Sequence, residues 1–243
     1  MSSRYCEHPV AGWLSPYVEC FWTIQPDAAL PEYLVLPDGC VDILFSTSGS
    51  QKVQVVGTMT RARKFPLPEG ETGFGVRFRP AMSSAFLRVP GSQLTDLSIP
   101  LEDVWGADGR QLSQQIAEAK STRRRIALIE ESLRLPGETG VVQWICPWII
   151  AQGGRVDIDK LAFQAGLSSR QLRRVFCEQT GLTPKHFCRV IRFRHSLSVL
   201  TSRKRGEWAQ VALECGYYDQ AHFDNEFREL SGYSPSQFVV LER

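Results

Sequence analysis

Short apolar runs separated by turn-forming residues make up the chain from about residue 17 to residue 79. The runs have strand length, with Gly, Pro, Asp and Ser between them: YVECFWTIQ, YLVLPDG, CVDILFS, KVQVVG and TGFGVRFRP. In the last run the alternation places Arg77 and Arg79 on one face of a strand and Val76 and Phe78 on the other. This pattern predicts a mostly antiparallel β domain.

The pattern changes to a helical period after residue 80, with helices predicted near PAMSSAFL, LEDVWG, DGRQLSQQIAEAK and TRRRIALIEESLRL. The stretch LPGETG, residues 135–140, supplies a proline and two glycines, which end a helix and suit a linker. Beyond it the pattern is helical to the last residue. We therefore expect an α+β protein of two domains, a β-rich domain with several helices over 1–137 and an all-α domain over 138–243.

Two stretches of the second domain repeat each other. LAFQAGLSSRQLRRVFCEQTGLTPKHF (161–187) aligns with VALECGYYDQAHFDNEFRELSGYSPSQF (211–238), with one extra residue after the first glycine of the second copy. Each copy has a short helix that ends at glycine and a second helix that Ser168 or Asp219 caps. The repeat predicts helix-turn-helix units at about 157–180 and 207–231, joined by a linker helix at about 184–201. The matched pairs are Gly166 and Gly216, Phe176 and Phe227, Gly181 and Gly232, Pro184 and Pro235, and Phe187 and Phe238.

Each second helix of the repeat has a packing side and an outward side at 100° per residue. Leu172 and Phe176 face inward in the first copy, and Phe223 and Phe227 do so in the second. A helix about 10–12 Å across with polar projections fits a DNA major groove, and a linker of about 27 Å can serve grooves that repeat every ~34 Å. Double-stranded DNA is therefore the expected partner. The outward residues are Arg170, Arg173, Arg174 and Cys177 in the first copy and Ala221, Asp224, Asn225 and Arg228 in the second.

The segment from about 141 to 243 resembles the double helix-turn-helix domain of the AraC/XylS family of bacterial transcription regulators, on the two repeated motifs quoted above. The resemblance implies sequence-specific DNA binding and promoter control, with RNA polymerase as a candidate partner. It implies DNA contacts at Ser169, Arg170, Arg173, Arg174, Gln220, Ala221, Asp224 and Asn225. Candidate phosphate contacts are Arg189, Arg203, Lys204, Arg205 and Arg228, whereas Arg192 is at least as well explained by an ion pair within the domain.

The front half resembles the N-terminal domain of an AraC subgroup whose effectors are mostly unassigned, through LVLPDGCVDILF, VVGTMTRARKF and GVRFRPAMSSAFL. The resemblance implies a cupin-like barrel that senses a small molecule or forms a homodimer. Arg77 and Arg79 form the candidate effector site for an anionic ligand. Ion pairs with Asp38 or Asp42 are the favoured alternative for these arginines.

The distribution of charge and the counts of His and Cys bear on the alternative functional classes. Residues 1–140 carry 14 Lys and Arg against 16 Asp and Glu, and residues 141–243 carry 14 against 10, so the excess of cations lies in the second domain. His8 is the only histidine before residue 186, too few for a cupin metal site, and the seven scattered cysteines suit reduced thiols. We expect no catalytic residue, metal or cofactor, no membrane contact and a cytoplasmic location. A nonspecific nucleic-acid-binding protein and, less favoured, a cupin-type enzyme with an added DNA-binding module remain the alternatives.

Overall fold

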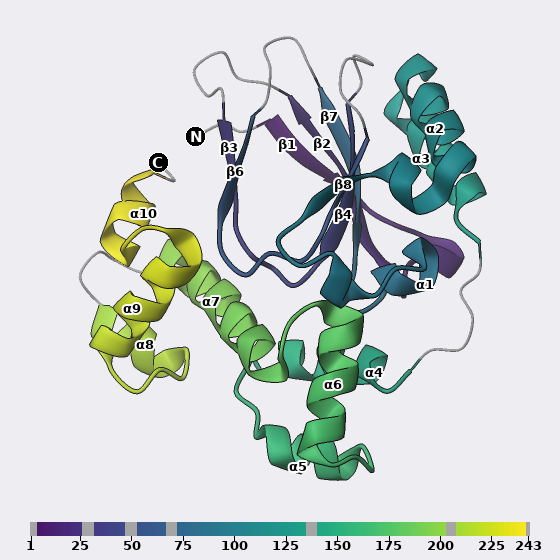
Figure 1. Ribbon diagram of the computed structural model, residues 1–243. Coiled ribbons are helices and arrows are strands. Elements are labelled where there is room, and N and C mark those ends of the chain that lie inside the picture. The colour runs from purple at the N-terminus through teal and green to yellow at the C-terminus, as the bar shows by residue number, and fades with distance from the viewer. Residues whose placement is uncertain are drawn as a thin grey trace.

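The computed structural model describes residues 4–25, 32–46, 53–66, 72–134, 140–202 and 208–241. A β-rich N-terminal domain stands beside a helical C-terminal domain (Figure 1). Every strand pair is antiparallel, in one six-stranded sheet of order β1-β2-β7-β4-β5-β8 and one pair, β3 and β6. The strands are β1 Arg4–His8, β2 Val18–Gln25, β3 Glu32–Val35, β4 Val41–Ser46, β5 Gln54–Val56, β6 Arg63–Pro66, β7 Gly73–Phe78 and β8 Ser98–Pro100.

One face of the large sheet forms the core of the N-terminal domain. The side chains of Ile43, Val76 and Phe78 are fully buried there, whereas Arg77 between the last two belongs to the opposite face. Helices α2 (Leu101–Glu118) and α3 (Thr122–Ser132) cover the apolar face with leucines and isoleucines (Figure 1). The predicted alternation along this strand is confirmed, and with it the mostly antiparallel β domain.

Several local expectations differ from the structure. Strands β1, β6 and β8 were not expected, because RYCEH and RKFP are short and each carries two charged residues, and SIP has only three residues. The two helices expected on either side of Gly106 are both present within α2, which is interrupted at Gly106 by a non-helical φ of 57°. The short helix α1 covers Ser83–Leu87, and two 3-10 turns, η1 and η2, cover Gly12–Leu14 and Gly91–Gln93. A cupin-like closure of the strands stays a prediction.

The C-terminal domain is helical throughout its described residues, as expected. The boundary predicted between residues 137 and 138 lies outside the described residues, so the domain limits stay a prediction. In the residues described here, no helix has the length and apolar content needed to cross a membrane. The helices are α4 Val142–Ala151, α5 Ile158–Gln164, α6 Ser169–Thr180, α7 Pro184–Ser202, α8 Trp208–Glu214, α9 Gln220–Ser231 and α10 Pro235–Leu241.

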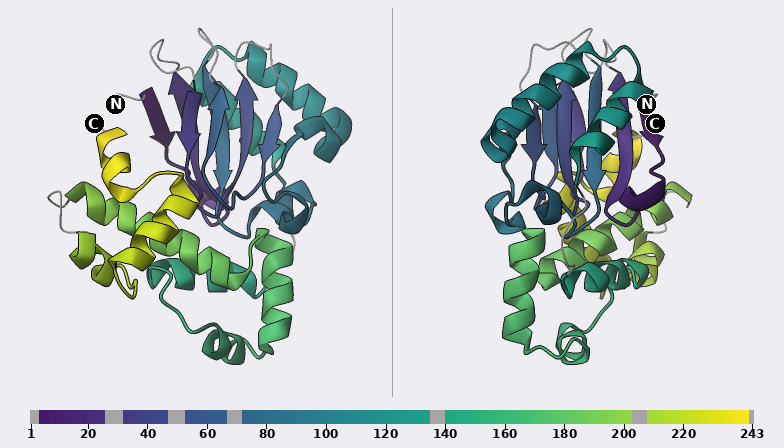
Figure 2. Two further views of the ribbon diagram at one scale, coloured as in Figure 1. Left: turned by 60° about the vertical axis from the view of Figure 1, so that its left-hand side comes forward. Right: turned by 90° about the vertical axis from the view of Figure 1, so that its right-hand side faces the viewer.

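The two domains are in direct contact. Ala81 of the N-terminal domain belongs to the hydrophobic cluster of the helical domain, and Leu34 and Leu36 pack against that cluster. The segment PDG, residues 37–39, presents Gly39 to the ring of Phe187 in α7. Gly39 has a φ of +83°, and a Cβ built on it would lie 2.5 Å from a ring carbon of Phe187, so only glycine fits here. Figure 2 shows the helices packed along one end of the β domain.

Candidate nucleic-acid interface

The first helix-turn-helix unit consists of α5 and α6. Ser168 caps α6 by accepting a hydrogen bond from the backbone of Gln171, and the Gln171 side chain accepts one from the Ser168 backbone in return. Asp157 caps α5 in a similar way. The Ser169 hydroxyl donates to Asp159, which ties the start of α6 to α5. These contacts fix the angle at which α6 leaves the turn.

The second unit, α8 and α9, repeats the first down to individual hydrogen bonds. Thr180 near the end of α6 donates its hydroxyl to the carbonyl four residues earlier and accepts the amide two residues later, at 2.8 and 3.1 Å. Ser231 at the end of α9 does the same, at 2.7 and 3.1 Å. Both helices then end at a glycine in the left-handed region, Gly181 at φ 80° and Gly232 at φ 81°. The sequence repeat is therefore a structural duplication.

The packing and outward sides of α6 and α9 lie as the helical angles predict. Leu172 and Phe176 of α6 are buried, as are Phe223 and Phe227 of α9. In α6 the outward side has three exposed arginines and the half-buried Cys177, and within the described residues no ion pair or hydrogen bond holds the guanidinium groups. In α9 the outward side is polar, with one half-buried acid, Asp224. The exposed residues on these faces are Arg170, Arg173, Arg174, Gln220, Ala221, Asn225 and Arg228.

Helix α7 separates the two units. Helices α6 and α9 both point toward the β domain with their C-terminal ends (Figure 1). In Figure 1 the N-terminal ends of α6 and α9 lie away from the β domain and their C-terminal ends lie close to it. Base contacts in helix-turn-helix proteins come from the N-terminal part of the recognition helix. With 19 residues, α7 has a length of about 28 Å. The N-terminal ends of both helices are thus directed away from the β domain.

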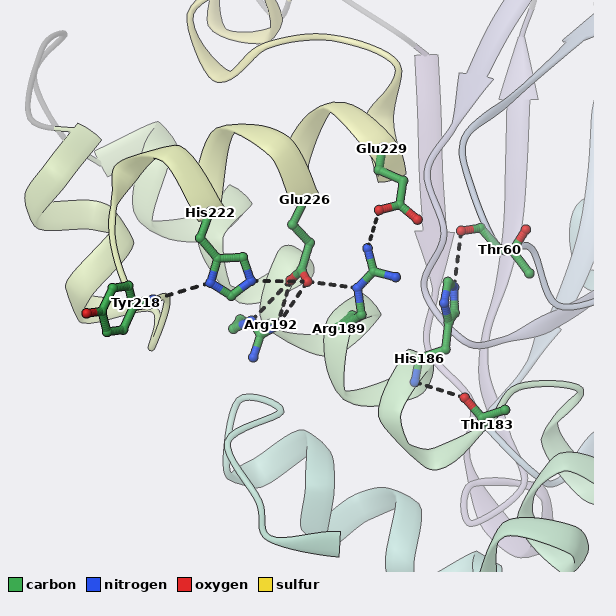
Figure 3. A network of polar contacts seen from close by, with 9 residues as sticks. All are labelled: Thr60, Thr183, His186, Arg189, Arg192, Tyr218, His222, Glu226 and Glu229. Atoms are coloured by element: carbon green, nitrogen blue, oxygen red, sulfur yellow. Dashed lines mark hydrogen bonds and ion pairs between the residues drawn. The ribbon is translucent and has the colours of Figure 1, made fainter.

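A buried carboxylate attaches α9 to α7. The side chain of Glu226 in α9 is 5% exposed and lies between two arginines of α7 (Figure 3). Arg192 donates to both of its oxygens, at 2.8 and 3.0 Å, and Arg189 donates to one at 2.8 Å. The guanidinium of Arg192 also stacks over Tyr217, 4.8 Å from the ring centre. This cluster fixes the rotation of α9 about its own axis.

Two neighbours extend the Glu226 cluster. His222 Nε2 lies 3.8 Å from Glu226, and its Nδ1 accepts the backbone N–H of Tyr218 at 3.4 Å (Figure 3). Glu229 at the rim pairs with Arg189, which lowers the pKa of Glu229 below its usual value. The cluster therefore runs from the turn that precedes α9 to the last turn of that helix.

The N-terminal domain bonds to the C-terminal ends of both α6 and α9. The buried hydroxyl of Thr58 donates to the carbonyl of Thr180 at 2.8 Å, on α6. Four residues later the N–H of Ala62 donates to the carbonyl of Leu230 at 2.7 Å, on α9. One segment, residues 58–62, which we term the bridging segment, therefore contacts both helices. Hydrogen bonds to the last carbonyls of a helix satisfy acceptors that the helix itself leaves open.

Two further contacts hold the same interface. Thr95 donates to the carbonyl of Gly181 at 2.8 Å. His186 of α7 donates from Nε2 to the carbonyl of Thr60 at 3.2 Å (Figure 3). Burial lowers the pKa of His186, and the neighbouring Arg189 lowers it further, so the neutral imidazole is favoured at this contact.

Residues 161–239 match the family described as "Helix-turn-helix domain", a span that contains both units and α7. Over 88 residues the chain is 35% identical to the HTH-type transcriptional activator RhaR of Klebsiella pneumoniae subsp. pneumoniae, an alignment that covers 35% of this chain and 30% of RhaR. The C-terminal domain is an AraC-type helix-turn-helix domain. The chain thus spans less than a third of the length of this curated relative.

The other comparisons concern the N-terminal part and the solved structures. Residues 7–100 match a domain of unknown function, DUF6597. A probable AraC family transcriptional regulator from Rhodopseudomonas palustris CGA009 is 28% identical and aligns with 42% of this chain and 96% of its own, with a TM-score of 0.38. ToxT from Vibrio cholerae O395 is 12% identical and aligns with 90% of this chain and 97% of its own, with a TM-score of 0.46.

The structure places most of the predicted contact residues on the outer surface of the AraC-type domain. Arg189 is engaged by Glu226 and Glu229, so a phosphate contact from it needs one of these pairs to open. Arg192 forms the expected ion pair within the domain. Arg228 is exposed on α9. The candidate phosphate contacts Arg203, Lys204 and Arg205 lie outside the described residues. All of these DNA and phosphate contacts stay predictions.

The two arginines of the candidate effector site lie in different surroundings. Arg77 lines a cavity of about 340 Å³ between the β domain and α7, and its Nε lies 3.4 Å from Asp38 and 3.3 Å from Asp42. The expected alternative, an ion pair, is therefore present, although mostly buried. Arg79 pairs with Glu19 outside this cavity and donates to the carbonyl of Ser15. Ligand binding by either arginine stays a prediction.

Sequence reasoning missed the residues that orient the AraC-type domain. Glu226 was not singled out, yet its helical angle lies on the packing side of α9, and an acid at such a position signals a buried cation partner. His222, for which the sequence predicts no role, also lies beside this carboxylate. Thr58 and Thr95 had no signal, since their partners are backbone carbonyls 122 and 86 residues away.

Proposed function

We propose that this protein is a sequence-specific, DNA-binding transcriptional regulator in which α6 and α9 enter successive major grooves of one duplex. The observation that carries the proposal is the duplication of a capped helix with an exposed polar face on each side of α7. A single helix of this kind is common on protein surfaces. Two of them with N-terminal ends on the same side, within an AraC-type domain, form the arrangement that a bipartite DNA site requires.

The two units differ in the chemistry that they offer to bases. On α6, Arg170, Arg173 and Arg174 are exposed cations, and an arginine can donate two hydrogen bonds to guanine. On α9, Asn225 can pair with adenine, whereas Asp224 is repelled by phosphates but can accept from a cytosine amino group. We therefore expect the first unit to contribute most of the specific affinity.

Fluorescence anisotropy with labelled duplexes tests this proposal once the bound sites have been mapped genome-wide. The mapped sequence should bind at least about 10³-fold tighter than a scrambled duplex of the same length. Arg174→Ala should weaken specific binding by roughly 10-fold or more, since a bidentate contact is worth ~1–3 kcal/mol, and Asn225→Ala should cost less. Arg134→Ala, at an exposed arginine of the N-terminal domain, is the matched control and should leave affinity unchanged. Equal affinity for both duplexes, falling equally with salt, is the result of a nonspecific nucleic-acid-binding protein.

The N-terminal domain supplies the regulatory part of the proposal. The cavity that contains Arg77 adjoins the bridging segment, so a small-molecule effector bound there touches the part of the domain that contacts both α6 and α9. Contacts with RNA polymerase, formation of a homodimer and a cytoplasmic location belong to the same proposal. We propose no enzymatic activity. No group of three or more potential metal ligands occurs in the parts of the chain that the structure describes.

A further inference from the structure

The Arg77 cavity has an unequal charge balance. Among the described residues that line it, three carboxylates (Glu7, Asp38 and Asp42) face two guanidiniums (Arg77 and Arg194). Asp38 and Asp42 are mostly buried and share Arg77, at 3.4 and 3.3 Å from its Nε. Burying two carboxylates against a single cation leaves one negative charge without compensation, which is costly in a medium of low polarity.

Burial also affects the titration of these groups. Desolvation raises the pKa of Asp42, and the nearby Arg77 opposes this change. The indole N–H of Trp22 donates to Asp42 at 2.7 Å, and the backbone N–H of Cys40 donates to Asp38 at 2.9 Å. A carboxylate has about four acceptor positions, so both groups keep room for a further donor or cation.

Aromatic rings form another wall of the cavity. Tyr5, Trp22, Tyr33 and Phe65 line it. The ring of Tyr5 stacks on that of Tyr33, with 6.4 Å between the ring centres, and lies 6.1 Å from that of Trp22. Ring faces attract cations, and an organic cation that touches several rings is held more tightly than a neutral molecule of the same shape.

We infer that the Arg77 cavity binds a small organic cation with an apolar or aromatic body, with its positive charge near Asp38 and Asp42. This inference rests on the proposed effector role of the cavity and reverses the sign of ligand charge expected from Arg77 alone. Arg77 is already neutralised by two acids, so an anion entering the cavity would add a further negative charge to the cluster. A cation compensates the remaining negative charge of Asp38 and Asp42, and it also makes favourable contacts with the aromatic rings of the cavity.

Isothermal titration calorimetry without DNA tests the inference with three probes of similar shape. Benzyltrimethylammonium is the cation, benzyl alcohol the neutral probe and phenylacetate the anion. We expect the cation to bind at least tenfold tighter than either of the others. Phenylacetate binding as tightly as the cation, or equal affinities for all three, would overturn the inference.

Variants locate the binding and separate charge from aromatic contact. Asp42→Asn should weaken cation binding about tenfold, and Tyr5→Leu should weaken it severalfold while benzyl alcohol binding changes less. Glu19→Gln is the matched control, since Glu19 is an exposed acid paired with Arg79 and does not line the cavity. Thermal melting shows whether each variant folds. If Asp42→Asn does not fold, Tyr5→Leu still tests the site. Equal loss of affinity in Glu19→Gln, or unchanged cation binding in both cavity variants, would contradict the assignment.

A DNA arm separates this inference from the proposed function. Anisotropy titrations of the mapped duplex are repeated with saturating benzyltrimethylammonium. Specific DNA binding without any cation binding would refute the assignment of a cationic ligand but not the proposed function as a DNA-binding regulator. Cation binding by a protein that does not distinguish DNA sequences would refute the proposed function but not the assignment of a cationic ligand to the cavity.

Discussion

Replacing Glu226 by glutamine tests whether the buried carboxylate holds α9 on α7. Glutamine keeps the size and shape of the side chain but removes its charge, so Arg189 and Arg192 lose a shared counter-ion. Removing one partner of a buried ion pair costs roughly 3–5 kcal/mol. Because the two arginine side chains remain 22% and 16% exposed, water compensates part of the loss. We therefore expect a cost at the lower end, about 3 kcal/mol.

Urea unfolding followed by circular dichroism measures this cost as a fall in the free energy of unfolding. Glu131→Gln is the control, since Glu131 pairs with Arg124 at the surface with side-chain exposures of 61% and 55%. An exposed pair is worth about 0–1 kcal/mol, so this control should remain close to the parent protein. If Glu226→Gln costs no more than Glu131→Gln, the Glu226 cluster does not hold the second unit in place.

Three further changes test the interface between the domains. Thr58→Val should cost about 1–3 kcal/mol in urea unfolding, because the Thr180 carbonyl loses its donor, whereas Thr58→Ser should restore most of that loss. Gly39→Ala should lower the melting temperature far more than Gly12→Ala, since both glycines have positive φ but only Gly39 abuts a ring; equal effects would contradict the close packing. The lowered pKa of His186 means that the unfolded chain binds this proton more readily, so its contribution to stability is complete above the ordinary value of 6.5 and is lost as pH falls below it. His186→Gln should flatten the fall in the urea midpoint between about pH 7 and about pH 5, and an unchanged slope would refute this assignment.

The sequence predicted the C-terminal domain more closely than the N-terminal domain. Helix-turn-helix units depend on local signals, namely a cap such as Ser168, a glycine such as Gly181 and an apolar side at helical spacing, and all of these lie within one short stretch of chain. The duplication doubled each signal. The expected linker helix at 184–201 accordingly agrees with α7, Pro184–Ser202, to one residue.

What the sequence could not predict depends on contacts between distant residues. Strand β8 has three residues and is placed by its pairing with β5, which no local pattern reveals. The position of Thr58 beneath Thr180 follows from the packing of one domain on the other. The sequence named Asp38 and Asp42 as candidate ion-pair partners of Arg77 but did not show that both pair with it at once, because the three residues converge only when two strands and a turn are assembled. The alternation along β7 placed Arg77 on the correct face, and the favoured ion pair with Asp38 or Asp42 is present.

Hydroxyl-radical footprinting on a duplex that contains the mapped site tests the central claim most directly. With both units in place, α6 and α9 should protect two patches of the backbone on one face of the DNA, about one helical turn apart. Arg174→Ala should remove or weaken one patch, and Asn225→Ala should affect the other. A single continuous protected region, two patches on opposite faces, or equal loss of both patches in either variant would contradict the account.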